Sequence, residues 1–318
     1  MILPARLIRR SAVGERVEIT MVNESKSSVR LYAILARKAP LAVVFRRGPS
    51  KQVLLVLWHT DTDDFHEGQW LKGRIYERRC DLSPSGKKLI YFAASHKRPF
   101  YSWTAISKPP FLTAIALWPK GDGWGGGGLF DSEREILLNH RSNEMSLADG
   151  FKLPKGVKVK PLGEHSGWGE DSPIVDRRLI RDGWNLVQRG ESIEHEVGAP
   201  MWIEFKPPEI WSKVSPLGNG DYELREVTNG LHERNGSWYV TEHVVINKDS
   251  KVAISLGKTD WADWCDNGEL LFAKDGAIFR LGFDKDGKLI PVEDARLLID
   301  LSERKFEARE ATADARSW

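Results

Sequence analysis

The sequence has few of the residues that mark a secreted, disulfide-bonded protein or a membrane-spanning one. Only two cysteines, Cys80 and Cys265, occur in 318 residues, and two in a chain of this size form no disulfide framework. No apolar run approaches the roughly 20 residues that a membrane-spanning helix needs. The first apolar stretch is interrupted by Pro4 and Arg6 and is too short for a secretion signal. We therefore expect a cytoplasmic protein that is not bound to a membrane.

A strong excess of charge of one sign is also missing. The formal net charge is +2, which provides no overall positive field for nucleic acid, so a nucleic-acid partner is not expected. Charge is nevertheless uneven, because residues 1–50 carry ten Lys or Arg against three Glu, a local +7 that leaves −5 for the remainder. Such an excess is compatible with a basic docking edge, although spread-out charges more often form an ordinary solvated face.

Tryptophan and glycine, by contrast, are abundant. The chain contains 13 Trp and 28 Gly. An indole ring has to be buried while its N–H finds a partner, and glycine-rich turns suit closely stacked sheets. The tryptophans are spread along the whole chain rather than gathered as in a single aromatic binding platform. This distribution predicts repeated packing of β-sheets.

The clearest local signal lies at residues 73–94. Pro84 fixes φ and Gly86 tolerates a positive φ, so residues 83–86 are predicted to form a turn. The apolar run at residues 89–93 follows at once and is typical of a strand buried on both faces. No segment after residue 40 shows a sustained helical period, and we expect the chain from there onward to be all-β.

A unit of four short strands is predicted near the C-terminus. Its turns contain Asn-Gly or Asp-Gly pairs, which supply the positive φ angles of tight hairpins. The strands are expected at residues 261–265, 270–273, 277–283 and 289–292. Consecutive antiparallel strands of this length form a meander.

These two stretches resemble a hairpin and a whole blade of a β-propeller of the WD40-like or TolB-like kind. Spread over residues 41–318, units of about 50 residues give five blades, with six as the alternative. The resemblance implies a disc with a central channel, whose loop-bearing face recruits a partner. Residues 41–45 are expected to close the ring by pairing with residues 295–300. A pair of β-sandwiches is the main structural alternative.

Residues 1–40 are expected to form an N-terminal extension that precedes the propeller. The segment at residues 27–38 predicts a helix, because a serine can serve as its N-cap, leucine and isoleucine line one face, and Pro40 would end it. A short strand is expected at residues 13–21, where apolar side chains alternate.

The segment from Trp58 to Glu67 is the sharpest cluster of metal-ligating residue types. His59, Asp61, Asp63 and His66 could bind a divalent cation such as Zn, Mn or Fe. The segment also has the position of a hairpin connection, where Asp and Thr are favoured for turn hydrogen bonds alone. We prefer the turn interpretation, and no other cofactor is expected.

Two kinds of feature suggest recognition. Paired guanidinium groups at a strand end can fork a carboxylate or phosphate, and an arginine beside a tryptophan can stack on the indole. Tryptophans in loops, one within a glycine run and one beside a histidine, are further candidates. The predicted binding residues are Arg46, Arg47, Trp124, His165, Trp168, Arg181 and Trp184. Salt bridges between neighbouring blades would explain the arginines equally well.

No complete catalytic motif is present: the glycine run at residues 121–128 lacks the Lys-Ser/Thr of a phosphate-binding loop, and no nucleophile elbow or zinc-protease motif occurs. We therefore expect a non-catalytic scaffold that docks a protein or peptide. Alternatives are a metal-assisted hydrolase or lyase with its site at the channel mouth, using the metal cluster and His165, and a carbohydrate-binding propeller in which exposed tryptophans stack on sugars.

Overall fold

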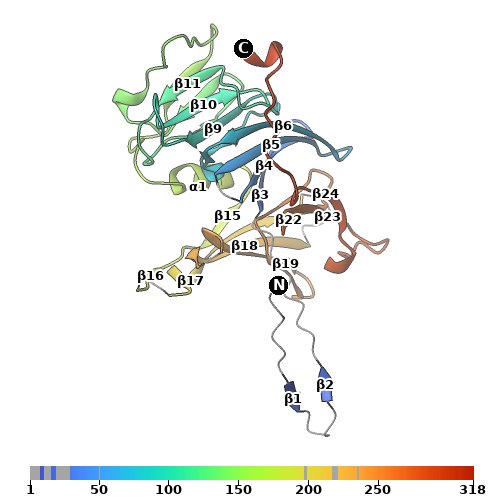
Figure 1. The fold of residues 1–318 in the computed structure, drawn as a ribbon. Coiled ribbons are helices and arrows are strands. Elements are labelled where there is room, and N and C mark those ends of the chain that lie inside the picture. Colours follow the sequence, from blue (N-terminus) through green and yellow to red (C-terminus); the bar gives the residue numbers. More distant parts are fainter. Residues whose placement is uncertain are drawn as a thin grey trace.

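The computed structural model describes residues 8–10, 16–18, 29–49, 51–196, 199–216, 221–234 and 236–318. Within these residues the chain is all-β, with five sheets of three to six strands, a separate two-stranded ribbon and a single α-helix (Figure 1). The ribbon pairs β1 (Ile8–Arg10) with β2 (Arg16–Glu18). No helix in the described ranges is both long and apolar enough to cross a membrane.

Sheets I to III form the first part of the chain. Sheet I contains β3 (Arg30–Leu35), β4 (Leu41–Arg47), β5 (Gln52–His59) and β6 (Asp64–Lys72), antiparallel in chain order. Sheet II contains β7 (Arg74–Ile75), β8 (Asp81–Leu82), β9 (Leu89–Ala94), β10 (Ser102–Ser107) and β11 (Ala116–Pro119). Sheet III contains β12 (Gly128–Phe130), β13 (Glu135–Leu138) and β14 (Lys158–Pro161), with β14 parallel to β13.

Along the sequence, the helix α1 (Ser172–Arg181) lies between these three sheets and the last two. Sheet IV contains β15 (Asn185–Gln188), β16 (Ser192–Glu194), β17 (Met201–Val214), β18 (Tyr222–Glu233), β19 (Tyr239–Asn247) and β20 (Ala253–Lys258). Sheet V contains β21 (Trp261–Trp264), β22 (Leu270–Lys274), β23 (Ala277–Leu281) and β24 (Arg296–Asp300). Short 3-10 turns occur at η1 (Glu77–Arg79), η2 (Ser142–Glu144), η3 (Val292–Asp294) and η4 (Asp314–Arg316).

The core consists of apolar clusters between the faces of neighbouring sheets. One face of sheet I packs on sheet II through residues such as Phe45 and Tyr91, and the opposite face packs on sheet V through residues such as Val44 and Leu271. Sheet II packs on sheet III, and sheet V packs on sheet IV. The sheets therefore pack in the order III–II–I–V–IV, and α1 contacts both β12 of sheet III and β15 of sheet IV.

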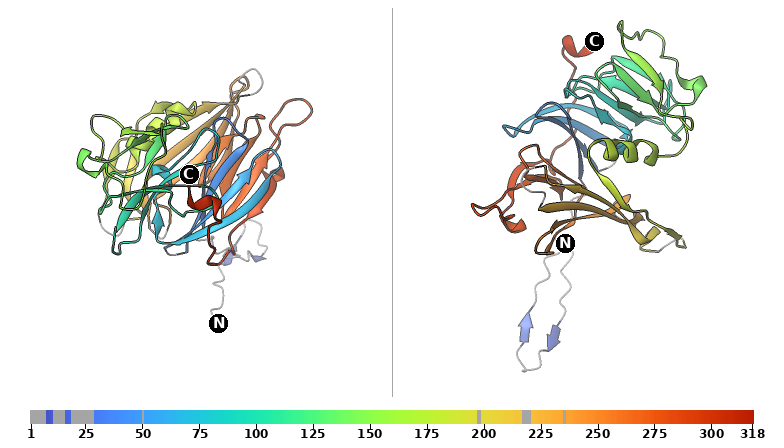
Figure 2. Two further views of the ribbon diagram at one scale, coloured as in Figure 1. Left: turned by 90° about the horizontal axis from the view of Figure 1, so that it is seen from above. Right: turned by 180° about the vertical axis from the view of Figure 1, so that it is seen from behind.

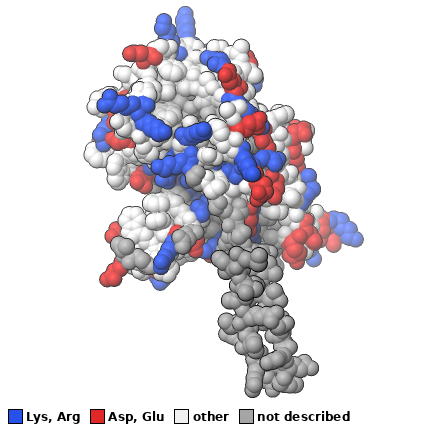
Figure 3. Space-filling model, in the orientation of Figure 1, with Lys and Arg blue, Asp and Glu red and all other residues white. Residues whose placement is uncertain are grey.

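The figures show this arrangement from opposite sides. In Figure 1 and in the rear view of Figure 2, α1 lies between the sheets of the upper half and the strands β15 to β18 below. On the surface facing the viewer, Lys and Arg gather across the upper half, whereas Asp and Glu are more frequent toward the right-hand edge (Figure 3). The core joins five sheets rather than the two layers of a sandwich pair.

Several predicted elements are confirmed. Strand β9 covers the predicted apolar run and is buried along its entire length. The amide of Gly86 donates to the carbonyl of Ser83 at 2.8 Å, as expected for the turn. In sheet V, Asp275 and Gly276 join β22 to β23 with φ angles of 52° and 83°, the positive values that such a hairpin requires.

The predicted helix at residues 27–38 is wrong in the described part of that segment. Residues 30–35 form β3, which pairs with β4 from Arg30↔Arg47 to Leu35↔Ala42. Leu31 and Ala33 bury against sheet V and Ile34 against sheet II, so both faces of the strand need apolar side chains. Sheet I therefore continues across the expected boundary at residue 40. Of the strand predicted at 13–21, residues 16–18 form β2 and the others lie outside the described residues.

Two further expectations are corrected by the structure. The predicted pairing of residues 41–45 with residues 295–300 does not occur, because β4 pairs with β3 and β5 while β24 pairs with β23. Contact between sheets I and V is made by side chains instead. The helix α1 lies in a region that was expected to have no helix.

Candidate functional site

Strand β3 passes between two cavities at the middle of the molecule. Residues 32–37 line a cavity of about 420 Å³, which we call the central cavity. Residues 30–32 line a smaller cavity of about 50 Å³ toward the other end of the strand. Tyr32 lies in the lining of both. Side chains from α1 and from sheets I, IV and V meet around this strand.

A buried ion pair joins two sheets beside β3. Nη2 of Arg78, in η1, lies 3.1 Å from Oε1 of Glu226 in β18, and each side chain is only 10% exposed. The Arg78 guanidinium also lies 4.0 Å from the centre of the Tyr239 ring. Burial alone would raise the pKa of Glu226, but Arg78 and His243 favour the carboxylate and lower that pKa to about 2. Glu226 is therefore ionised at neutral pH.

Arginines of α1 extend this network to sheets I and II. Arg178 donates to the carbonyl of Cys80 and to the Tyr32 hydroxyl. Arg181 forks the carboxylate of Asp81 with contacts of 2.7 and 2.9 Å, and it also pairs with Asp182 at 2.8 Å. These contacts fix α1 in place and occupy the guanidinium groups, because bidentate arginine–carboxylate pairs are strong and directional.

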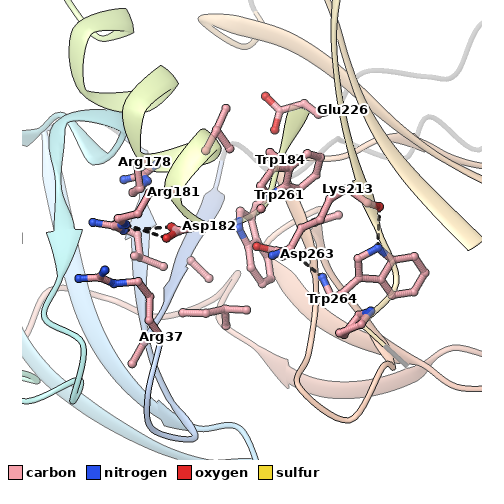
Figure 4. A pocket seen from close by; sticks show the side chains of 18 of the residues that line it. Arg37, Arg178, Arg181, Asp182, Trp184, Lys213, Glu226, Trp261, Asp263 and Trp264 are labelled. Atoms are coloured by element: carbon pink, nitrogen blue, oxygen red, sulfur yellow. Dashed lines mark hydrogen bonds and ion pairs between the residues drawn. The ribbon is translucent and has the colours of Figure 1, made fainter. Parts of the chain in front are cut away.

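Three arginines line one wall of the central cavity, and a lysine–aspartate pair lines the other. Figure 4 shows the guanidinium groups of Arg37, Arg178 and Arg181 on one side, and Lys213, Asp263 and Trp264 on the other. The Lys213 ammonium lies 2.7 Å from the Asp263 carboxylate. Burial raises the pKa of Asp263, while Lys213 opposes that rise. The site therefore presents cations and a carboxylate to whatever enters it.

Arg37 makes fewer contacts than the other two arginines of the cavity. Its Nη2 donates to the carbonyl of Phe130 at 2.7 Å, and its buried Nε has no hydrogen-bond partner within the described residues. A guanidinium bound by a neutral carbonyl keeps the capacity to bind an anion. Trp184 and Trp261 are buried in the same lining and supply apolar surface. The cavity can thus hold a group that carries negative charge at one end and donors at the other.

The structure places the predicted binding residues in different parts of the molecule. Arg181 and Trp184 both line the central cavity. Arg46 is buried and donates to the carbonyls of Leu301 and Ser302 at 3.1 and 3.0 Å, so it fastens the C-terminal segment to β4. Arg47 pairs with Glu77 near the smaller cavity.

The remaining predicted residues lie on loops beside sheet III. His165 and Trp168 line a second cavity of about 420 Å³, and Trp168 is 64% exposed. Trp124 is 59% exposed, and its loop meets the other loop where the amide of Gly125 donates to Gly169 at 2.8 Å. The three residues are therefore neighbours on the surface and do not reach the central cavity.

The predicted metal cluster is not assembled. Among the described residues, no three His, Cys, Asp or Glu side chains are placed to hold a metal ion. Asp63 lies in the turn between β5 and β6, where its carboxylate pairs with Arg280 and Arg296, both at 2.6 Å. The rings of His59 and His66 meet edge to face at 5.4 Å. Within the described residues, the four predicted ligands are therefore not arranged as a metal site.

Several residues of the centre could not be identified from the sequence. Arg78 and Glu226 are separated by 148 positions, and the residues around either one do not indicate its partner. Lys213 and Asp263 are 50 positions apart. No short motif contains either pair. The only usable signal was the adjacent Arg and Trp at residues 181–184.

Comparison with known proteins gives no family assignment. No protein-family model and no curated protein matches the chain. Among solved structures, a proposed 6-phosphogluconolactonase from Bacteroides fragilis matches at 12% identity and a TM-score of 0.32, over 93% of this chain and 91% of that one. The β-propeller domain of the Trilobed protease from Pyrococcus furiosus matches at 10% identity and a TM-score of 0.27, over 87% and 99%.

An acylaminoacyl peptidase also matches, at 12% identity and a TM-score of 0.24, over 85% of this chain but only 40% of the peptidase. At these TM-scores the likenesses transfer neither a fold nor an activity.

Proposed function

We propose that this chain is a non-catalytic binding module of the β-propeller class, with the five sheets as blades, that docks a protein or peptide partner. The central cavity is the proposed docking point. The observation that carries this is the pairing of an arginine wall, in which Arg37 has no carboxylate partner among the described residues, with a wall that holds Asp263. A peptide offers carboxylates, amides and ammonium groups in one extended ligand and can satisfy both walls.

The depth of the cavity limits how a partner enters. Glu226, Tyr32 and Arg178 belong to its lining, where Glu226 pairs with Arg78 and Arg178 donates to the Tyr32 hydroxyl. Opening this network would leave buried charges unpaired, which costs several kcal/mol per charge. A partner would therefore insert a side chain or chain end rather than thread through the molecule. The buried free cysteines are compatible with the reducing cytoplasm that we propose as its location.

A selection from a random peptide library on the immobilised chain tests this proposal. Enriched peptides are measured by calorimetry against wild type, Arg37→Gln and Asp263→Asn. We expect each substitution to weaken binding about tenfold or more, because a hydrogen bond to a charged group contributes about 1.5–3 kcal/mol. Thermal melts of each variant show whether the fold is kept.

Trp168→Ala is the matched control, since Trp168 lies on the separate loop surface. Peptide binding that is unchanged in both cavity variants would contradict the central cavity as the docking point. Exposed Trp124 and Trp168 favour a second candidate function, stacking on a sugar ring, because indole faces on a surface suit such ligands. Binding of a glycan that is lost only in Trp168→Ala would support that alternative instead.

A further inference from the structure

A further recess, which we call the basic groove, lies at the other end of β3 from the central cavity. It encloses about 600 Å³ and is bordered by the starts of β3 and β5, the junction of β6 with β7, the turn after β9 and the hairpin between β18 and β19. Every titratable side chain in its lining is basic: Arg30, Arg47, Lys51, Arg74, His96 and His232. No carboxylate belongs to the described lining.

Carboxylates near the basic groove neutralise only part of its charge. Glu77 pairs with one cation of the lining, Arg47, whereas Glu233 pairs with Lys258, which is not in the lining. Asp260 accepts a hydrogen bond from the amide of Leu31 at 3.1 Å, and its burial raises its pKa to about 7. The groove therefore keeps a net positive charge, which draws anions toward it.

The cations of the groove are held in different ways. Arg74 lies with its guanidinium 4.4 Å from the centre of the Tyr76 ring, and its buried Nε has no hydrogen-bond partner in the ranges that the structure describes. Lys51 is exposed, and its carbonyl accepts a hydrogen bond from the amide of Gly73 at 2.9 Å, which ties the loop of Lys51 to the loop of Arg74. The two cations thus stand on connected backbone beside one recess.

An aromatic surface completes the groove. The Trp238 and His232 rings stack at 5.3 Å with 28° between their planes, and both belong to the lining. A stacked ring pair beside clustered guanidinium groups suits a ligand with an anionic head and a flat or apolar body. Arginine forks a tetrahedral oxyanion bidentately, whereas lysine adds a point charge.

We propose that the basic groove binds a phosphomonoester. Such a group is close to a dianion at neutral pH and offers three strong acceptor oxygens, which suits several cations in the lining of one recess better than a single carboxylate does. Its bearer is either a small sugar phosphate or a phosphorylated peptide, and both present the same head group. The groove lies apart from the central cavity, so this inference stands whether or not a peptide docks there.

Calorimetry with phenyl phosphate as the probe tests the groove in the full-length chain. Arg74→Gln and Lys51→Gln are expected to weaken binding about tenfold each, and Lys155→Gln, which removes an exposed lysine from the loop before β14, to leave it unchanged. Lys51 is exposed and its side chain is remote from the core, so Lys51→Gln keeps the test valid if Arg74→Gln does not fold.

Competition experiments then identify the bearer. Ribose 5-phosphate and a phosphoserine peptide are compared with phenyl phosphate. Whichever of these two competitors binds more tightly identifies the kind of molecule that carries the phosphomonoester. Benzoate is the carboxylate control and should bind at least tenfold more weakly than phenyl phosphate. The proposal is overturned if phenyl phosphate shows no saturable binding, or if the two groove variants bind it like wild type. It is also overturned if benzoate binds as tightly as phenyl phosphate, or if a single-stranded oligonucleotide binds more tightly than any monoester.

Discussion

Replacing Glu226 with glutamine should destabilise the protein strongly at neutral pH and much less in acid. The Glu226 carboxylate is held at a pKa of about 2 instead of its ordinary 4.5, a difference that corresponds to about 3 kcal/mol of stability. Because the folded-state pKa is depressed, this contribution is fully present above pH 4.5 and is lost as the pH falls toward 2. Arg78, only 10% exposed, would also lose its partner, and an unpaired buried charge costs about 3–5 kcal/mol.

Urea unfolding followed by tryptophan fluorescence measures this difference, since the chain contains 13 Trp. The free energy of unfolding of Glu226→Gln should be about 3–5 kcal/mol below that of wild type at pH 7. The gap should shrink by about 3 kcal/mol as the pH is lowered through the window from 4.5 to 2. Titration of the groups that do not interact with Glu226 is shared by the two proteins and largely cancels in the comparison.

The matched control is Glu310→Gln. Glu310 also pairs with an arginine, Arg316, at 3.0 Å, but its side chain is 93% exposed. Exposed pairs contribute about 0–1 kcal/mol, so this variant should stay within that range at every pH. A gap for Glu226→Gln that is below about 1 kcal/mol at pH 7, or that does not change between pH 7 and pH 3, would refute the assignment of a stabilising buried ion pair at the centre.

Two further predictions concern close packing and thiol accessibility. Gly126 has a φ of 82°, and an added Cβ would lie 2.3 Å from the Phe92 ring, so Gly126→Ala should lower stability by about 2–5 kcal/mol in urea unfolding. Gly121→Ala, with a φ of 84° but open space around the added carbon, should lose only about 1–2 kcal/mol; equal losses would contradict the packing argument. Cys80 is fully buried and burial raises the pKa of its thiol, so a maleimide should label it only when the protein is unfolded. Labelling in native buffer at the rate of a free thiol would contradict that placement.

The strands that were predicted correctly share a local cause. At β9 a proline-glycine turn precedes an apolar run, and at β22 and β23 an Asp-Gly pair fixes the hairpin. Turn residues act within a few positions, so their effect is visible in the sequence. The prediction of an all-β chain rests on turn residues of this kind, which mark where strands begin and end.

The elements that were predicted wrongly are those whose burial depends on distant parts of the chain. β3 is covered by sheet II on one side and sheet V on the other. Its short, mostly apolar sequence therefore lacks clean alternation, and such runs cannot be told from helices by periodicity. The helix α1 has the opposite problem: its buried face contains Ile174, Val175 and the charged Arg178, which interrupts the apolar stripe that marks an amphipathic helix.

The same dependence explains why the sequence revealed so little of the candidate site. Arg178 reaches from α1 to Tyr32 in sheet I and to Cys80 before β8. Its role exists only once three separate segments are packed together, and nothing near position 178 in the sequence indicates those partners. The sequence places an arginine and a tryptophan close together at residues 181–184. It does not show which of these side chains has no hydrogen-bond or ionic partner in the folded protein.

The polar centre has a physical reason that bears on binding. Apolar contacts lie between the faces of neighbouring sheets. The helix α1 contacts β12 of sheet III and β15 of sheet IV, and its arginines bond to Tyr32 of sheet I and Asp81 of sheet II. The guanidinium groups of Arg178 and Arg181 are therefore already used to hold the molecule together. An incoming anion would have to displace the Cys80 carbonyl and the Tyr32 hydroxyl from Arg178, and it would have to compete with the carboxylates of Asp81 and Asp182 for Arg181. Arg37 is bound only to a neutral carbonyl in the described structure. Ligand affinity at the central cavity should consequently depend far more on Arg37 than on Arg178 or Arg181, whose replacement should reduce stability first.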